Sequence, residues 1–553
     1  MNAYRLAIGV IAALSTGIIF SGSSASALAR AATGDSPTDG LQLTAVQTVT
    51  PSPARWLPYV PPALPPASED GDDQSGGGAN VLSSVAPTPL AGWLGPRSPT
   101  RSQTMPQIGG SLTGLSNPGT IEPADVQLGV GPTDVVEMVN SSVEIWSKTG
   151  KVEAQQSLGQ YFTSAASDRR ADAMTDPRVL YDQQSGRWFA SVLDLTQLQV
   201  ILVISPTAQP SAGTWIYTFP SSGCQDQPRL GVSDSLVAIG DNLFTACQPG
   251  GQLLGGQLTV LDKSDLLSGA VVREQVYGPS LLFASLTPVV SLSSTGTLYF
   301  AATDVIFRAI DVFATSQVSA SGAVLPVTRV FINAIGDAPD ALQSDPALIP
   351  TGDDRVQNAV WENGTMWIAV GDGCLVTGET GVHACGRYFG INTTTMSLSM
   401  DAGVALDQNR DLYYPAIMPT SDGNLFTVFG YSSAAETPSI GILANPNQTP
   451  NWYVLTQGTG ANESGRWGDY FGIARDPSDP THVWIAAAYG NGGNTWATTV
   501  AAISASPFSI APPVAAPPTA KPPAKKILPK KPPICKKGQK STKQHKCRKR
   551  STA

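Results

Sequence analysis

Between about residues 113 and 510, apolar residues alternate with polar ones over short stretches that end in turn-forming residues. Residues 366–370 form a short apolar stretch just after Asn363-Gly364, a dipeptide typical of two-residue β-hairpin turns. Similar stretches follow Gly186, Gly296 and Gly423. No amphipathic helical pattern extends beyond about two turns. The pattern therefore predicts an all-β domain.

A short motif recurs along these strands: an aspartate, one or two spacers, often an arginine, and then alternating apolar residues. Its copies begin at Asp125, Asp176, Asp226, Asp354 and Asp469, with degenerate copies near Ser285 and Tyr414. Repeats about 50–70 residues apart are typical of folds built from one supersecondary unit per repeat. Seven units of roughly 56 residues would each hold four short strands. We predict a seven-bladed β-propeller, with six or eight blades as alternatives and β-sandwiches as the main rival.

The two ends of the chain differ from this domain. Residues 1–31 contain Arg5, an apolar run and small residues, a pattern typical of a secretory signal peptide. Residues 32–112 are rich in Pro, Ser and Gly and are predicted to be a flexible linker. The propeller is predicted to span 113–510, followed by a Pro/Lys-rich tail over 511–553. We expect a secreted protein with no transmembrane span in its mature form.

Charge is divided unevenly between the domain and the tail. The tail holds thirteen of the 34 Lys and Arg residues and no acidic residue, which leaves 21 basic residues against 42 acidic ones before it. The tail is therefore predicted either to be a solvated extension or to tether the protein to an anionic wall or membrane surface. No aromatic residue interrupts the lysines, which argues against a sequence-specific nucleic-acid site.

Six cysteines lie in three close pairs. The pairs are Cys224 with Cys247, Cys374 with Cys385, and Cys535 with Cys547. An even number of cysteines in a secreted chain is typical of disulfides, and local pairing is the simplest of the fifteen connectivities. The spacing does not match a zinc site.

The aspartate motif defines the candidate site. Equivalent positions of a propeller form a ring around the channel, so the repeat predicts convergence of these side chains at one channel mouth. The predicted ring consists of Asp125, Asp176, Arg178, Asp226, Arg229, Asp354, Arg355 and Asp469. One interpretation is structural: each aspartate accepts backbone N–H groups where a strand begins and pairs with an arginine, which locks neighbouring blades together.

Three functional interpretations of this ring remain open. The carboxylates could bind Ca²⁺, which prefers oxygen ligands. The arginines could bind the carboxylates of a glycan, peptide or protein ligand, with Trp188, Trp361, Trp367 or Trp467 stacking on sugars. A pair such as Asp176 and Asp226 could hydrolyse glycosidic bonds.

Three longer motifs suggest a family. Residues 130–140, 176–188 and 466–477 resemble secreted bacterial β-propeller proteins of the BNR/sialidase-like superfamily, and the tail resembles basic C-termini of secreted actinobacterial proteins. The resemblance covers most of residues 113–505 and implies a fold and an extracellular location more than an activity. Sialidase chemistry would assign Arg178, Arg229 and Arg355 to a substrate carboxylate and Tyr470 to the nucleophile. However, only a fragment of the Ser-x-Asp-x-Gly-x-x-Trp box is present, at Ser421.

No other catalytic signature is present: the chain lacks a G-x-S-x-G elbow, an H-E-x-x-H helix and a phosphate-binding loop. The sequence therefore favours a secreted binding or interaction module of unknown ligand over an enzyme. The alternative is a glycan-active, sialidase-like hydrolase that uses carboxylates at the channel mouth.

Overall fold

The computed structural model describes the central part of the chain. The described ranges are 40–54, 106–117, 121–163, 174–210, 214–247, 250–318, 323–376, 378–379, 381–448, 452–492 and 495–506. All of them belong to the first of two compact units, residues 1–507. The predicted signal peptide, the basic tail and the pair Cys535–Cys547 lie outside the described residues.

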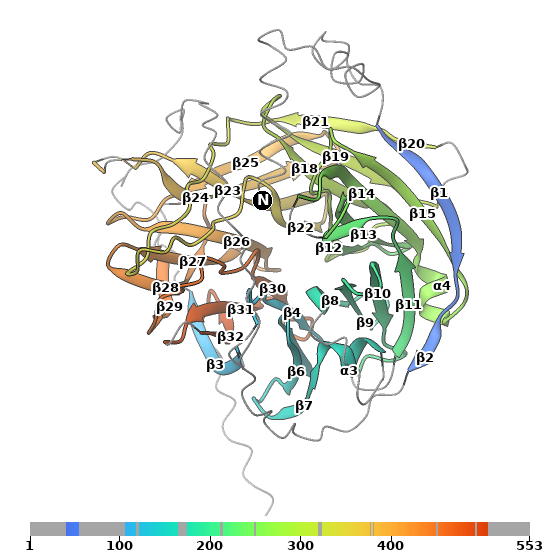
Figure 1. Ribbon diagram of the computed structural model, residues 1–553, viewed down its shortest axis with the longest axis horizontal. Coiled ribbons are helices and arrows are strands. Elements are labelled where there is room, and N and C mark those ends of the chain that lie inside the picture. The colour runs from blue at the N-terminus through green and yellow to red at the C-terminus, as the bar shows by residue number, and fades with distance from the viewer. Residues whose placement is uncertain are drawn as a thin grey trace, which may run out of the picture. The chain divides into compact units, whose positions relative to one another are not determined.

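Short strands alternating with tight turns give antiparallel meanders of four strands (Figure 1). The first consists of β4 (Gln127–Val130), β5 (Asp134–Met138), β6 (Ser142–Ser147) and β7 (Val152–Ser157), followed by α3 (Leu158–Thr163). The second consists of β8 (Met174–Asp182), β9 (Arg187–Asp194), β10 (Gln199–Ile204) and β11 (Thr214–Pro220). The third consists of β12 (Cys224–Val232), β13 (Leu236–Phe244), β14 (Leu253–Asp262), α4 (Lys263–Ser268) and β15 (Val272–Ser280).

The remaining meanders follow the same plan. The fourth consists of β16 (Thr287–Pro288), β18 (Leu298–Asp304), β19 (Ala309–Thr315) and β21 (Val327–Phe331). The fifth consists of β22 (Val356–Glu362), β23 (Thr365–Cys374), β24 (His383–Asn392) and β25 (Ser397–Val404). The sixth consists of β26 (Asp411–Pro419), β27 (Leu425–Ser433), β28 (Glu436–Ala444) and β29 (Trp452–Thr456). The last consists of β30 (Gly472–Arg475), β31 (His482–Gly490), β32 (Trp496–Ser504) and the N-terminal strand β3 (Gln107–Ser116).

The first strands of these meanders surround a common axis (Figure 1). Each contacts the first strand of the next meander, in the closed order β4, β8, β12, β16, β22, β26, β30 and back to β4. The last meander is completed by β3, which precedes the first meander in the chain and pairs with β32. This arrangement is an all-β propeller, as predicted.

The number of separate sheets differs from the seven blades predicted. Five sheets of four or five strands are separate blades, and the other strands form one continuous sheet of eleven. The link is the two-residue strand β17 (Val290–Ser291), in which Val290 pairs in parallel with Val232 on one side and Val360 on the other. Because backbone pairing at β17 extends from β12 to β22, hydrogen bonding merges the third and fifth meanders.

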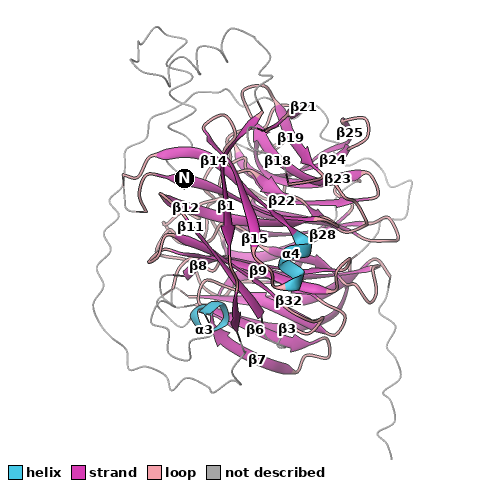
Figure 2. Cartoon of the chain, turned by 90° about the vertical axis from the view of Figure 1, so that its right-hand side faces the viewer, coloured by secondary structure: helices cyan, strands magenta, loops and turns pink. Residues whose placement is uncertain are grey.

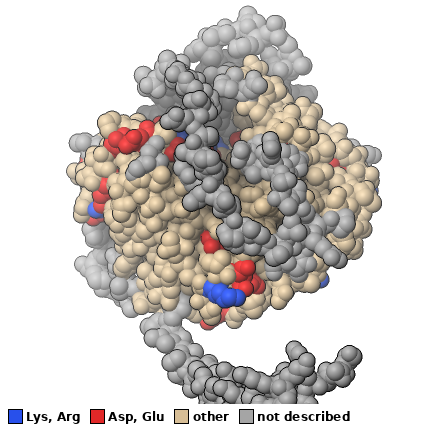
Figure 3. All heavy atoms as spheres, turned by 60° about the horizontal axis from the view of Figure 1, so that its bottom comes forward, with Lys and Arg blue, Asp and Glu red and all other residues tan. Residues whose placement is uncertain are grey.

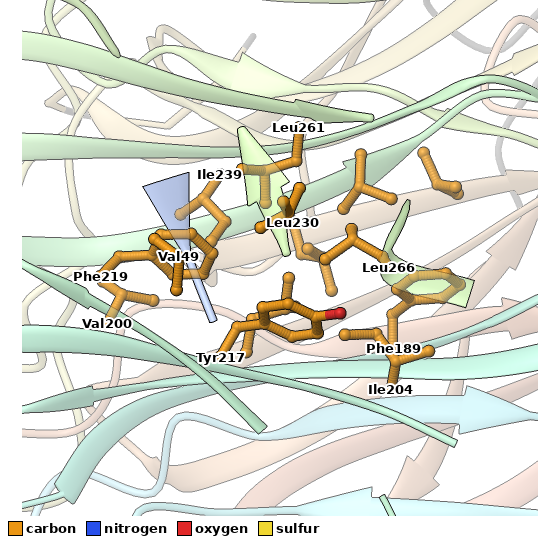
Figure 4. Close-up of a cluster of buried hydrophobic side chains, with 14 of the residues drawn as sticks. Val49, Phe189, Val200, Ile204, Tyr217, Phe219, Leu230, Ile239, Leu261 and Leu266 are labelled. Atoms are coloured by element: carbon orange, nitrogen blue, oxygen red, sulfur yellow. The ribbon is translucent and has the colours of Figure 1, made fainter. Parts of the chain in front are cut away.

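Part of the predicted linker is folded. Within residues 32–112, β1 (Leu41–Val49) pairs with β15 (Figure 2). Strand β2 (Ser52–Ala54) pairs with β11. Strand β1 also pairs with the short strand β20 (Val324–Leu325). Val49 enters the core formed by the second and third meanders, among residues such as Phe219 and Ile239 (Figure 4). The linker prediction is therefore wrong for β1, β2 and the first residues of β3, because the outer strands offer unpaired edges that these segments cover.

Two predicted disulfides are confirmed. Cys224 is bonded to Cys247, and Cys374 is bonded to Cys385. The predicted hairpin turn is also present, with Asn363 and Gly364 at φ 47° and 89° between β22 and β23. Within the described ranges no helix is long and apolar enough to cross a membrane.

Candidate functional site

Five of the seven inner strands have an unusual backbone near their start. Several residues there adopt left-handed φ angles: Asp125 (47°), Asp176 (55°), Gln227 (50°), Ser285 (54°) and Tyr414 (52°). Prolines follow three of them, and the ladders of β8, β12 and β26 shift register at these points. Proline has no N–H to donate to a ladder, so it is found in sheets mainly at edges and bulges. In these three copies the recurring sequence motif therefore contains a β-bulge.

Hydrogen bonds to the neighbouring meander hold the bulges in place. The N–H of Asp176 donates to Asn140 Oδ1 (2.8 Å), and the N–H of Gln227 donates to Asp176 Oδ2 (2.9 Å). The N–H of Ser285 donates in the same way to Asn242 Oδ1 (2.7 Å). Each of these hydrogen bonds between meanders offsets the conformational free-energy cost of a residue with a left-handed backbone.

Asp125 joins the first meander to the last. Its Oδ1 accepts the N–H of Asp469 (2.9 Å), and its Oδ2 accepts Asn140 Nδ2 (2.7 Å). Burial, and then the carboxylates of Asp469 and Asp176, raise the pKa of Asp125 well above its ordinary value. The aspartates at these repeats therefore lie close enough to repel one another. Asp125 and Asp176 both act as acceptors between meanders, the structural role considered above.

Charged groups are concentrated in this interior. On the face drawn in Figure 3, most described residues are uncharged and acidic side chains occur in small groups. At the channel mouth, by contrast, buried or half-buried charged residues interact with one another: Asp125, Asp176, Arg178, Asp226, Arg229, Asp353, Asp354, Arg355, Arg466 and Asp469.

Arg355 pairs with a different aspartate from the one predicted. Its Nε and Nη2 donate to Asp353 Oδ1 (2.5 Å) and Oδ2 (2.7 Å), a bidentate pair. Asp354, the predicted ring member, has an unpaired buried Oδ2, and burial together with Asp353 raises its pKa to about 7. The prediction was displaced by one residue, because adjacent aspartates point in different directions and the sequence does not distinguish them.

Asp469 and Asp226 have opposite electrostatic environments. Burial acts to raise the pKa of Asp469, but Arg466, whose Nη2 donates to Asp469 Oδ2 (2.6 Å), and Arg355 outweigh it and hold this pKa below its ordinary value. Asp226 is partly exposed, and its carboxylate has no hydrogen-bond partner among the described residues. Burial and the charge of Asp176 raise the pKa of Asp226 to about 6, against the opposing effect of Arg355. The mouth thus combines a proton-holding carboxyl with an ionised one.

Arg178 and Arg229 do not pair with the ring aspartates. No carboxylate of the described chain lies within ion-pair distance of either guanidinium, so the predicted Asp–Arg pairing fails for both. Arg178 stacks on the ring of Tyr470, with Cζ 3.4 Å from the centroid. Arg229 Nη2 donates to Gln227 Oε1 (2.6 Å).

A cavity of about 120 Å³ lies between the inner strands. It is lined by residues of the inner strands, among them Arg178, Arg229, Gln357 and Arg475. Sites for drug-sized ligands measure roughly 300–1,000 Å³, so this cavity is too small for a sugar ring with its substituents. A glycan would have to bind at the mouth.

The aromatic residues proposed for sugar stacking or catalysis are mostly in the core. Trp188, Trp361 and Trp467 are buried, and the first two donate their indole N–H to Ala208 O and Thr393 Oγ1. Trp367 is partly buried against the core of the fifth and sixth meanders.

Tyr470 is not suited to act as a nucleophile. Its hydroxyl donates to Pro177 O (3.3 Å), and burial raises the pKa of this phenol well above its ordinary value. The geometry therefore does not support the sialidase-like assignment of Tyr470.

The geometry does not support the suggested Ca²⁺ site. Among the described residues no group of three or more Asp, Glu, His or Cys side chains is arranged to hold a metal ion. Three of the ring carboxylates, those of Asp125, Asp176 and Asp469, are instead engaged by backbone N–H groups or by an arginine.

Sequence reasoning missed four residues of the site: Asn140, Asp353, Tyr414 and Arg466. Asn140 and Arg466 lie within motifs 130–140 and 466–477, so both were available as candidates. Tyr414 begins a degenerate copy of the repeat, and its hydroxyl donates to Pro350 O.

Comparison with known proteins gives only distant likenesses. No family model and no curated sequence matches the chain. Among solved structures, a protein of unknown function from Dyadobacter fermentans aligns with 72% of this chain and 99% of its own at 11% identity and a TM-score of 0.37. An α-L-arabinofuranosidase from Fusarium graminearum aligns with 60% of this chain and 93% of its own, at 11% identity and a TM-score of 0.35. An endo-arabinase from Bacteroides thetaiotaomicron aligns with 59% of this chain and 92% of its own, at 11% identity and a TM-score of 0.27. Likenesses this distant carry no argument about activity, and the BNR/sialidase-like resemblance stays a prediction.

Proposed function

We propose that this protein is a secreted glycan-active hydrolase whose catalytic residues are Asp226 and Asp469. The observation that carries the proposal is the divergence of their pKa values at one channel mouth, that of Asp226 raised and that of Asp469 lowered. Paired carboxyl groups in such environments divide the roles of acid and base. Glycoside hydrolysis commonly needs one carboxyl of each kind.

The roles follow from the protonation states. Asp226, partly exposed and protonated in weakly acidic solution, would donate a proton to the glycosidic oxygen of the leaving group. Asp469, kept ionised by Arg466 and Arg355, would stabilise the positive charge that develops on the sugar ring or activate the attacking water. Asp176, which was paired with Asp226 from the sequence, is less suited to the ionised role because burial and the charge of Asp469 raise its pKa.

The proposal predicts an acidic pH optimum. Activity requires protonated Asp226 and ionised Asp469, so it should fall by about tenfold per pH unit as the pH rises above about 6, where Asp226 loses its proton. On the acid side, activity should persist until Asp469 takes up a proton, below its ordinary pKa. The optimum should lie at about pH 4–5. Measurement of kcat/KM from pH 3 to 8 checks this, and a profile that rises through pH 7 would contradict the assignment.

The decisive first experiment is a turnover assay. Purified protein at about pH 5 is incubated with a panel of neutral and acidic glycans, and released reducing ends are quantified. Cleavage of at least one glycan by wild type is expected. Absence of turnover over the whole panel would remove the enzyme proposal.

The second candidate is a binding or interaction module, the function favoured from the sequence. It is supported by Asp125 and Asp176, whose carboxylates serve contacts between meanders and are not available for chemistry. Saturable retention of a glycan without turnover, measured by calorimetry, would favour this candidate.

We also propose that the two meanders joined through β17 behave as separate blades, which gives seven in total. The link between them consists of only three residue pairs, Val232–Val290, Val290–Val360 and Ser291–Trp361. The closed order of the seven first strands supports this count, as does the recurrence of left-handed residues near the starts of five of them.

The extracellular location and the role of the tail are part of the proposal. Two disulfides in the described chain support an oxidising compartment. Thirteen basic residues in the tail would attract an anionic wall or membrane surface, and such binding would weaken with salt.

A further inference from the structure

We propose that the channel cavity binds a small monovalent anion between Arg178 and Arg229. Both arginines line this cavity, and each is more than nine-tenths buried. Their guanidinium groups carry unpaired buried nitrogens: Nε and Nη2 of Arg178 and Nη1 of Arg229. A buried N–H without an acceptor costs about 1–3 kcal/mol, and more on a charged group, so such atoms mark a place for a ligand.

The surrounding carboxylates cannot satisfy these donors. Asp353 is held by Arg355, Asp469 is held by Arg466, and Asp176 accepts Gln227 N. Asp226 lies nearby but outside ion-pair distance of both arginines. Since each neighbouring carboxylate is engaged or lies beyond ion-pair distance, the free N–H groups of Arg178 and Arg229 have no acceptor among the described residues.

The arginines also repel one another. Burial, and then the charges of Arg355 and Arg178, lower the pKa of Arg229 to about 9. An anion placed between Arg229 and Arg178 would offset both desolvation and repulsion, because it supplies the missing countercharge and accepts the free N–H groups.

The size of the cavity defines the ligand. A volume of about 120 Å³ accommodates a halide or a small oxyanion such as formate, with some water, but not a sugar acid. Stacking on Tyr470 fixes the guanidinium plane of Arg178, so its unpaired edge has a defined direction. Neither Asp226 nor Asp469 lines the cavity, so the anion site is separate from the proposed acid/base pair.

Thermal unfolding in matched sodium salts tests the proposal. Chloride, bromide and formate should each raise the unfolding midpoint by about 2 °C or more over gluconate at equal ionic strength, with saturation as the salt concentration rises. Gluconate is the control because it is too large for the cavity. Midpoints in chloride, bromide and formate that all equal the gluconate midpoint would overturn the proposal, and a rise with formate alone would restrict the site to carboxylates.

Variants and diffraction give independent readouts. Arg178→Gln and Arg229→Gln should each abolish the difference between chloride and gluconate, whereas Arg273→Gln, an exposed arginine of the same meander as Arg229, should retain it. Crystals of wild type grown in bromide should show an anomalous peak within the cavity. An unchanged salt response in both variants, or water alone at this position, would contradict the site. These readouts need no turnover, so they succeed or fail independently of the proposed hydrolase.

Discussion

Replacing Asp226 with Asn is expected to lower kcat on a cleaved glycan by about 10²–10⁴-fold, the usual contribution of a general acid. Asn has nearly the same shape but cannot donate a proton to the leaving oxygen at the required strength. Asp469→Asn should cause a loss of the same order, because it removes the ionised partner. Steady-state kinetics at about pH 5 check both variants.

Stability measurements separate this catalytic loss from unfolding. The folded-state pKa of Asp226 is raised to about 6, above the unfolded value, so its contribution to stability is fully present at low pH and is lost as the pH rises through 6. At pH 7 the ionised carboxylate is a desolvated charge, and Asp226→Asn removes it. The variant should therefore unfold at the same temperature as wild type or a higher one.

Asp407→Asn is the matched control, since Asp407 is 69% exposed and distant from the ring interactions. Its kcat should equal that of wild type. An unchanged kcat in Asp226→Asn, or an equal loss in Asp407→Asn, would contradict the assignment.

The repeat predicted the propeller and the place where the charges converge, but not which side chains interact. The motif around Asp226 illustrates the reason. The left-handed residue of that copy is Gln227, and its N–H, not that of Asp226, donates to Asp176. Successive side chains of a strand point to opposite faces. A bulge that adds one residue therefore changes which residue hydrogen-bonds to the neighbouring meander and which one faces solvent. A one-residue shift of this kind is invisible in a pattern of aspartates.

Long-range pairing was also beyond the sequence. Residues 41–49 alternate only weakly, and most of their side chains are exposed. Their order comes from backbone pairing with β15, about 230 residues later in the chain, whose edge would otherwise be open. The composition of residues 32–112 predicted a flexible linker, and it contained no information about the open edge of β15 with which residues 41–49 pair.

Replacing Lys263 with Met is expected to destabilise the fold by about 3–5 kcal/mol, the cost of breaking a buried ion pair. Lys263 Nζ lies 2.5 Å from Asp182 Oδ2, and the two side chains are 2% and 1% exposed. The pair links the third meander to the end of β8, and Nζ also donates to Ser233 O (2.7 Å). Methionine fills the space but leaves Asp182 as a buried charge without a countercharge. Urea denaturation should show the loss as a lower midpoint.

Two further variants decide whether the uncompensated charge causes this loss. Lys151→Met removes an exposed pair with Glu153, in which Lys151 is 71% exposed, and should cost less than about 1 kcal/mol. The double variant Lys263→Met with Asp182→Asn should recover part of the stability, because a neutral amide can still interact with the loop at Ser185 without burying a charge. If Lys263→Met lowered the free energy of unfolding by no more than Lys151→Met, the Lys263–Asp182 ion pair would not contribute to stability. Recovery in the double variant would instead identify the pair as the electrostatic link between neighbouring meanders at the end of the channel opposite the aspartates.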